Sequence, residues 1–219
     1  MPGARRAGQR AFAAGFTLVE LLAVIGIIGL LLAIALPAFN NISRGSAIGQ
    51  EAAKLKTTLN LARQMAITQR TRTYVVFPQQ QLTWLEGSNY TYRSYMVYIK
   101  PTPTNNYLEP ASGLNLLPNG LVFSHTARPD PSTKNFMRYA PVLRTGLKLQ
   151  SPSGAIVDNV SIRALCFKPN GGLDINWVNE IYLAEGYMDG ALPTSFDTKY
   201  MNSVEVYNFT GLARINVYE

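Results

Sequence analysis

The stretch Gly15-Phe16-Thr17-Leu18-Val19-Glu20 opens a long apolar run that ends at Pro37. No side chain from Leu21 to Leu36 is charged or polar, so Glu20 is a lone carboxylate at the start of the run. An ionised carboxylate placed in hydrocarbon costs about 2.5–3.5 kcal/mol or more. A segment that served only as an anchor would have no reason to carry this cost. We therefore expect the Glu20 carboxylate to have a partner, and that partner is the main clue to function.

The composition of this run and of the residues before it indicates a membrane-spanning helix with a defined orientation. Residues 16–39 supply about the 20 apolar residues that cross a bilayer as a helix. Residues 1–15 are basic, with arginine at positions 5, 6 and 10 and no acid. Positive charge before a span keeps that end of the chain in the cytoplasm. We therefore predict a single-pass inner-membrane protein with a cytoplasmic amino terminus and a periplasmic globular domain.

A secretory signal peptide is the main alternative, because Ala33-Ile34-Ala35 forms an A-x-A cleavage site near the end of the run. However, the run is longer than the usual hydrophobic region of such a peptide, which has about 7–15 residues. Glu20 would also have no purpose in a peptide destined for removal. The residues thus favour a helix that is retained.

The helix is expected to continue beyond Pro37, although proline removes one backbone hydrogen bond and usually kinks or ends a helix. Residues 40–70 carry apolar side chains at alternating steps of four and three, which form one stripe along a helix. Charged and polar side chains lie off this stripe. We predict one helix from Phe16 to about Gln69. Its amphipathic second half should pack on a domain through Ile48, Ala52, Leu55, Leu59, Ala62 and Ala66.

The remainder of the chain, residues 71–219, has the pattern of a β-rich globular domain. Aromatic and β-branched runs bounded by turn residues predict strands at 73–77, 82–86 and 92–99. Hairpins are predicted between 160–167 and 173–178, and between 204–207 and 212–217. Segments rich in proline, glycine and asparagine predict loops at 101–119, and exposed polar residues predict another at 125–135. The fold class is therefore α+β, with one long amino-terminal helix packed on a mostly antiparallel β-sheet.

The amino-terminal features together resemble a type IV prepilin or a type II secretion pseudopilin. These features are the basic leader 1–15, Gly15 before Phe16, Glu20 as the fifth residue after that bond, the apolar helix and Pro37. The resemblance implies that prepilin peptidase cuts a class III leader between Gly15 and Phe16 and methylates the new amino group of Phe16. It also implies that Glu20 aligns subunits by attracting the amino terminus of a neighbour, since a buried carboxylate is tolerable when paired.

This resemblance also implies the partners. Other pilins or pseudopilins would pack against the amino-terminal helix in a filament, and an inner-membrane assembly platform would insert the subunit. Membrane lipid would surround the helix before assembly. The same signal serves both a type IV pilus and a type II secretion pseudopilus, so both machines remain open.

A second resemblance concerns the rest of the chain. The segment 59–67 is similar to the one that closes the long helix in the GspH/FimT group of minor pilins. The segments 167–171 and 210–214 approximate the turn and the final hairpin of that group. The middle, 78–159, has no pattern that we can place.

Two departures from major subunits point to a minor one. The lone Cys166 cannot form the carboxy-terminal disulfide loop that is usual in a major adhesive pilin. Asp174, Asp189 and Asp197 are too dispersed for the calcium loop of a major pseudopilin.

No catalytic, metal or cofactor site is expected. His125 is the only histidine, which excludes a cluster of histidine ligands. Ser124 and Asp130 lie near it, but no nucleophile elbow or comparable frame surrounds them. We therefore expect a structural protein that is not an enzyme.

The alternative function is a binding module at a filament tip, for example a DNA-capturing minor pilin for natural transformation. The net charge is +7, although the leader contributes three of the positive charges. A tyrosine cluster beside Arg93 and Lys100 could stack bases of single-stranded nucleic acid, but an amphipathic strand is the favoured interpretation. The cluster comprises Tyr90, Tyr92, Tyr95 and Tyr98. A phosphate-binding patch could use Arg128, Lys134, Arg138, Arg144 and Lys148.

Overall fold

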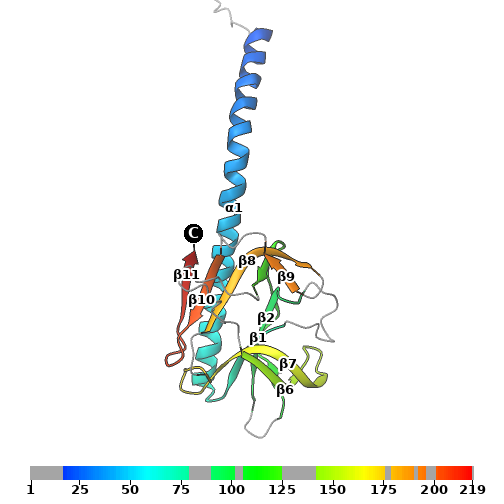
Figure 1. Ribbon diagram of the computed structural model, residues 1–219, viewed down its shortest axis with the longest axis vertical. Helices are drawn as coiled ribbons and strands as arrows, with labels where there is room; N and C mark the ends of the chain where they lie inside the picture. The colour runs from blue at the N-terminus through cyan, green and yellow to red at the C-terminus, as the bar shows by residue number, and fades with distance from the viewer. Residues whose placement is uncertain are drawn as a thin grey trace, which may run out of the picture. The chain divides into compact units, whose positions relative to one another are not determined.

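The computed structural model describes residues 17–78, 90–101, 106–124, 142–175, 179–189, 192–195 and 201–218. The chain divides into two compact units, Met1–Arg44 and Gly45–Glu219. The predicted strand 82–86 and the predicted loop 125–135 lie outside the described residues, as do Gly15 and Phe16. The α+β class is confirmed, because a long amino-terminal helix is followed by antiparallel strands (Figure 1).

Helix α1 runs from Leu18 to Thr68 and includes Pro37, close to the predicted limits of Phe16 and Gln69. The strands then follow in chain order. They are β1 (Thr73–Phe77), β2 (Ser94–Ile99), β3 (Glu109–Pro110), β4 (Asn115–Leu116), β5 (Leu121–Phe123), β6 (Val142–Gln150), β7 (Ile156–Phe167), β8 (Asn179–Asp189), β9 (Leu192–Ser195), β10 (Met201–Val206) and β11 (Ala213–Tyr218).

The strands form two antiparallel sheets in the second unit. The first sheet has the order β3-β2-β1-β7-β6, and β4 also pairs with β2. The second has the order β11-β10-β8-β5, and β9 also pairs with β8. In the hairpin of β10 and β11, Val204 lies opposite Ile215 and Val206 opposite Ala213, which confirms the hairpin predicted here.

The main core lies between the second half of α1 and one face of each sheet. All six residues of the predicted stripe are buried, from Ile48 to Ala66. They pack against strand residues that share one face because alternate side chains of a strand point the same way. From the first sheet these are Val75, Phe77, Tyr95, Val97, Leu165 and Phe167; from the second, Leu121, Phe123, Ile181, Leu183, Val204, Val206 and Ala213. The rings of Phe77 and Phe123 pack edge to face with their centroids 5.3 Å apart, so the two sheets are also in contact.

A second apolar cluster covers the opposite face of the first sheet. Tyr74 and Val76 of β1 and Met96 and Tyr98 of β2 are buried there. Other strands complete the cluster with Leu108, Leu149, Ile162, Ala164 and Cys166. Strand β2 is therefore buried on both faces, and the prediction of an amphipathic tyrosine strand was wrong. The reason is that β2 lies inside a sheet with apolar layers on both sides.

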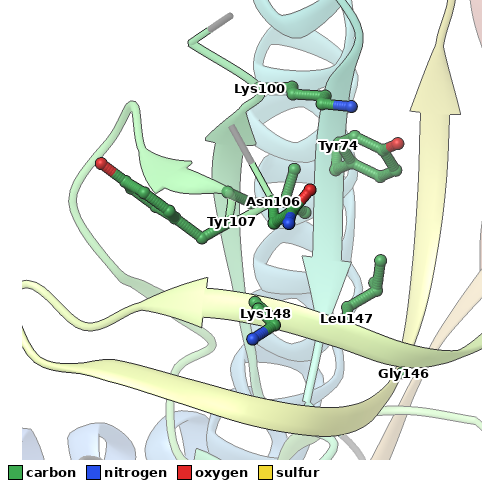
Figure 2. A pocket seen from close by; sticks show the side chains of 8 residues that line it. Tyr74, Lys100, Asn106, Tyr107, Gly146, Leu147 and Lys148 are labelled. Atoms are coloured by element: carbon green, nitrogen blue, oxygen red, sulfur yellow. The ribbon is translucent and has the colours of Figure 1, made fainter. Parts of the chain in front are cut away.

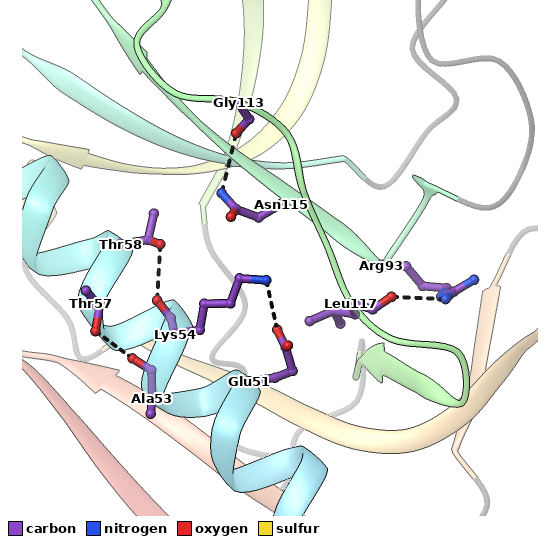
Figure 3. Close-up of polar contacts among 9 residues, drawn as sticks. All are labelled: Glu51, Ala53, Lys54, Thr57, Thr58, Arg93, Gly113, Asn115 and Leu117. Carbon is purple, nitrogen blue, oxygen red and sulfur yellow. Dashed lines mark hydrogen bonds and ion pairs between the residues drawn. The ribbon is translucent and has the colours of Figure 1, made fainter.

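Two loop and hairpin predictions also need correction. The segment 101–119 is not wholly irregular, because β3 and β4 both pair with β2. The guanidinium of Arg93 helps to hold this segment, donating to the Leu117 carbonyl at 3.1 Å (Figure 3) and to Asn119 Oδ1 at 2.9 Å. Of the hairpin predicted from 160–167 to 173–178, the part described as far as Ile175 forms one bridge, Phe167 with Leu173, and β7 pairs with β1 and β6 instead; residues 176–178 lie outside the described residues.

Candidate functional site

The start of α1 carries a capping box formed by Thr17 and Glu20. The backbone N–H of Thr17 donates to Glu20 Oε2 at 3.0 Å, and the Thr17 hydroxyl donates to the same oxygen at 2.9 Å. In return, the backbone N–H of Glu20 donates to Thr17 Oγ1 at 3.2 Å. Reciprocal bonds of this kind satisfy backbone groups that a helix start would leave unpaired.

Thr17 is a site residue that the sequence-based prediction missed. The Glu20 carboxylate binds Thr17 of its own chain, and the predicted partner in a neighbouring subunit stays a prediction. Both donated bonds converge on Oε2, and no bond to Oε1 occurs within the described residues. The spacing Thr-x-x-Glu was a readable signal for this arrangement.

From Leu18 to Leu32, α1 is covered by exposed apolar side chains. They follow one another along the sequence, so they point to every side of the helix, since successive residues are turned by about 100°. Such a surface is normally covered by lipid or by other protein. Its large members are Leu18, Val19, Leu21, Leu22, Val24, Ile25, Ile27, Ile28, Leu30, Leu31 and Leu32.

Within the described residues, no helix is long and apolar enough to cross a membrane.

The tyrosine cluster does not form a surface for base stacking. Tyr95 and Tyr98 are buried, and burial raises the pKa of each phenol to about 12. Tyr92 is buried as well, which leaves Tyr90 as the partly exposed member. The stacking interpretation was therefore wrong for Tyr92, Tyr95 and Tyr98, because all three side chains are buried in the domain.

Two lysines that the sequence placed in separate groups come together at one cavity. Lys100 and Lys148 line a cavity of about 150 Å³ together with Tyr74 and Tyr107 (Figure 2). Lys148 is already paired with Asp158 at 2.9 Å. Arg144 lies in β6. The other members of the predicted phosphate patch, Arg128, Lys134 and Arg138, lie outside the described residues, as does His125.

The acidic residues considered as metal ligands in the sequence lie in different places. Among the described residues, no group of three or more His, Cys, Asp or Glu is placed to hold a metal ion. Asp174 is paired with Arg72 at 2.8 Å, and Asp189 ends β8, whereas Asp197 is not described. Cys166 is buried and, as the one cysteine of the sequence, forms no disulfide within the chain.

The three segments of the second resemblance meet at the carboxy-terminal end of α1. The Arg63 guanidinium donates through Nε to the Thr210 carbonyl at 2.5 Å. Gly171 and Gly211 touch each other at the same place, since a Cβ on Gly211 would lie 2.0 Å from the Gly171 carbonyl oxygen. Both glycines have positive φ, 84° and 66°. We call this contact the glycine junction; it joins α1 to the turn after β7 and to the β10–β11 turn.

One comparison with known proteins, the match to a family motif, supports the first resemblance. Residues 10–36 match the family described as prokaryotic N-terminal methylation motif. Among curated proteins, none matches the chain. Among solved structures, the chain is similar to the type IV minor pilin FimU of Pseudomonas aeruginosa, with 12% identity and a TM-score of 0.41. That likeness covers 78% of this chain and 88% of FimU.

The motif match contains Gly15, Phe16 and Glu20, the residues on which the prepilin resemblance was based. The chain therefore carries the amino-terminal signal of a type IV pilin or pseudopilin, and that prediction is confirmed.

Proposed function

We propose that this protein is a minor pilin or pseudopilin, a structural subunit of a type IV pilus or a type II secretion pseudopilus. The observation that carries the proposal is the methylation motif at residues 10–36, which holds one carboxylate, Glu20, and whose described part from Leu18 onward forms the start of α1 with an exposed apolar surface. Pilins of this class are structural proteins. The chemistry at Phe16 is thus done to this protein by prepilin peptidase and not by it.

The proposed assembly uses the amino-terminal half of α1 twice. Before assembly, its apolar side chains lie in the lipid of the inner membrane, with the amino end in the cytoplasm and the domain in the periplasm. During assembly the platform exchanges lipid for the helices of other pilins. Glu20 Oε1 then accepts a hydrogen bond from the positively charged, methylated amino group of Phe16 of a neighbouring subunit. Oε2 keeps its bonds to Thr17. Such pairing compensates the cost of a carboxylate away from water.

Replacement of Gly15 by leucine is expected to block processing. The peptidase would then leave residues 1–15 attached, and the protein would run larger on a denaturing gel than the wild type. Mass spectrometry of the amino terminus checks both the cut and the methyl group on Phe16. A shortened Gly15→Leu protein would count against this cleavage site.

Glu20→Gln is expected to reduce incorporation into filaments by at least about tenfold, since removing one partner of a buried ion pair costs several kcal/mol. Glutamine keeps the size of the side chain and an oxygen that can accept from Thr17, but it removes the charge. The measurement is the ratio of this subunit in sheared filaments to that in membranes, with membrane insertion unchanged.

Thr17→Val is the matched control for the capping role, because it removes the donor hydroxyl and keeps the Glu20 charge. We expect this variant to be incorporated within about twofold of the wild type, since losing a helix cap costs only about 1 kcal/mol. If Thr17→Val fails to assemble and Glu20→Gln assembles normally, Glu20 acts as a cap and the charge-pairing account is wrong.

A further inference from the structure

The turn between β10 and β11 presents an aromatic side chain almost entirely to solvent. Phe209 is 94% exposed, more than any other large apolar residue described in either unit. Leu212 in the same turn and Ile67 near the end of α1 are also exposed. These residues lie close together, because the backbone of Phe209 contacts Gly172 and the side chain of Ile67 contacts the neighbouring Gly171. We name Phe209, Leu212 and Ile67, with the flanking Arg63 and Lys168, the Phe209 surface.

The turn that carries Phe209 is held in one conformation. The N–H of Gly211 donates to the Tyr207 carbonyl at 2.7 Å, and the N–H of Tyr207 donates to the Leu212 carbonyl at 3.0 Å. Leu173 N–H donates to the Asn208 carbonyl at 2.7 Å, which ties the turn to the segment after β7. The contact of Gly211 with Gly171 in the glycine junction holds the other end of this turn. An aromatic side chain on a fixed turn loses little entropy when it is buried, as binding anchors do.

The ring stands beside a recess and two cations. A cavity of about 130 Å³ adjoins Phe209 and is lined also by Lys168, Asn170, Leu173, Ile175 and Asn208. Arg63 lies beside the glycine junction. Among the described residues, neither Arg63 nor Lys168 forms an ion pair. The Phe209 surface is therefore apolar at its centre and cationic at its edge, and the complementary surface is apolar with carboxylates around it.

We propose that the Phe209 surface docks the globular domain of another subunit of the same assembly, one that presents carboxylates around an apolar recess. This inference rests on the function proposed above, because bundled helices hold neighbouring domains at high effective concentration. Aliphatic Leu212 and Ile67 need an apolar counterpart, which phosphates do not offer. Two cations are also few for a nucleic-acid site, where affinity comes from many phosphate contacts.

Site-specific photocross-linking in the living cell tests this docking. The photoreactive p-benzoylphenylalanine replaces Phe209 in the full chain, a conservative change at an exposed ring. After irradiation we expect a covalent product with another pilin or pseudopilin, identified by mass spectrometry of the linked peptides. The control places the same group at Ile156, an exposed residue at the start of β7 in the other sheet, and should give at least fivefold less of that product.

The charge requirement is tested by combining the cross-linker with Lys168→Glu. Lys168 makes its turn bonds through backbone atoms, so the reversal changes charge and leaves the turn intact. We expect the product to fall at least fivefold, and Lys168→Arg to retain it. Equal yields from Lys168→Glu and wild type overturn the proposal.

Other products also overturn the inference: no cross-link at 209, or one only to lipid, nucleic acid or a protein outside the assembly. If Gly15→Leu and Glu20→Gln behave as expected while position 209 fails, the docking inference is wrong and the proposed function stands. If those two variants fail to change processing and incorporation, the proposed function itself is wrong.

Discussion

Replacing Gly211 with alanine should lower the free energy of unfolding by about 2–5 kcal/mol. One part is the left-handed backbone at φ 66°, which costs a residue with a Cβ about 1–2 kcal/mol. The other part is overpacking, of about 1–3 kcal/mol, because the new Cβ would lie 2.0 Å from the Gly171 carbonyl oxygen. A backbone oxygen cannot rotate away as a side chain can, so the junction must open. Urea unfolding followed by near-ultraviolet circular dichroism measures the loss.

Gly146→Ala separates these two contributions. Gly146 has a similar φ of 69°, but nothing lies within 4 Å of the Cβ it would gain. We therefore expect this variant to lose only the conformational part, about 1–2 kcal/mol. Equal losses in the two variants would show that the contact between Gly211 and Gly171 is unimportant for stability.

Leu59→Ala should lower the free energy of unfolding by about 2–5 kcal/mol, the usual range for leucine replaced by alanine in a core. Leu59 is fully buried in the cluster that joins α1 to both sheets. Truncation removes apolar contacts and leaves a cavity that two sheets and a helix cannot all move to fill. The measurement is the midpoint and slope of the same urea transition.

Leu61 provides the control, since it lies two residues away on the same helix and is 48% exposed. Leu61→Ala should change stability by less than about 0.5 kcal/mol, as surface substitutions usually do. Both variants raise helix propensity equally, so their difference reports burial alone. If Leu61→Ala destabilised the protein as much as Leu59→Ala, the assignment of the buried stripe would be wrong.

Much of the fold could be predicted because its signals are local. The steps of four and three from Ile48 to Ala66 require a helix with one buried face, and the structure buries that face. The β10–β11 hairpin could also be predicted from the sequence, because two apolar runs flank a short turn that ends in Gly211. Such patterns depend on neighbours within a few residues.

The elements that were missed depend on distant partners or carry mixed signals. Strands β3 and β4 have two residues each, too few to show a period of two. Strand β6 contains Gly146 with positive φ and a shift of register beyond Arg144, which interrupts its alternation. In β8, Tyr182 and Ala184 are buried as well as Ile181 and Leu183, so burial does not alternate.

The candidate site shows the same division. The motif at Gly15, Phe16 and Glu20 lies within six consecutive residues, so the amino-acid sequence alone was enough to recognise it. Thr17 was overlooked although it stands in the same stretch, because a charge in an apolar run suggests a partner outside the chain. Contact between Arg63 and Thr210 spans 147 positions, so no local pattern could reveal the glycine junction.

The buried stripe of α1 also has a mechanical consequence. Its side chains belong to one core with Val75 and Leu165 of the first sheet and with Leu183 and Val204 of the second. A pull along the helix is therefore divided between two sheets that resist in parallel. Neither sheet can be peeled from the helix without opening the interior that the other shares.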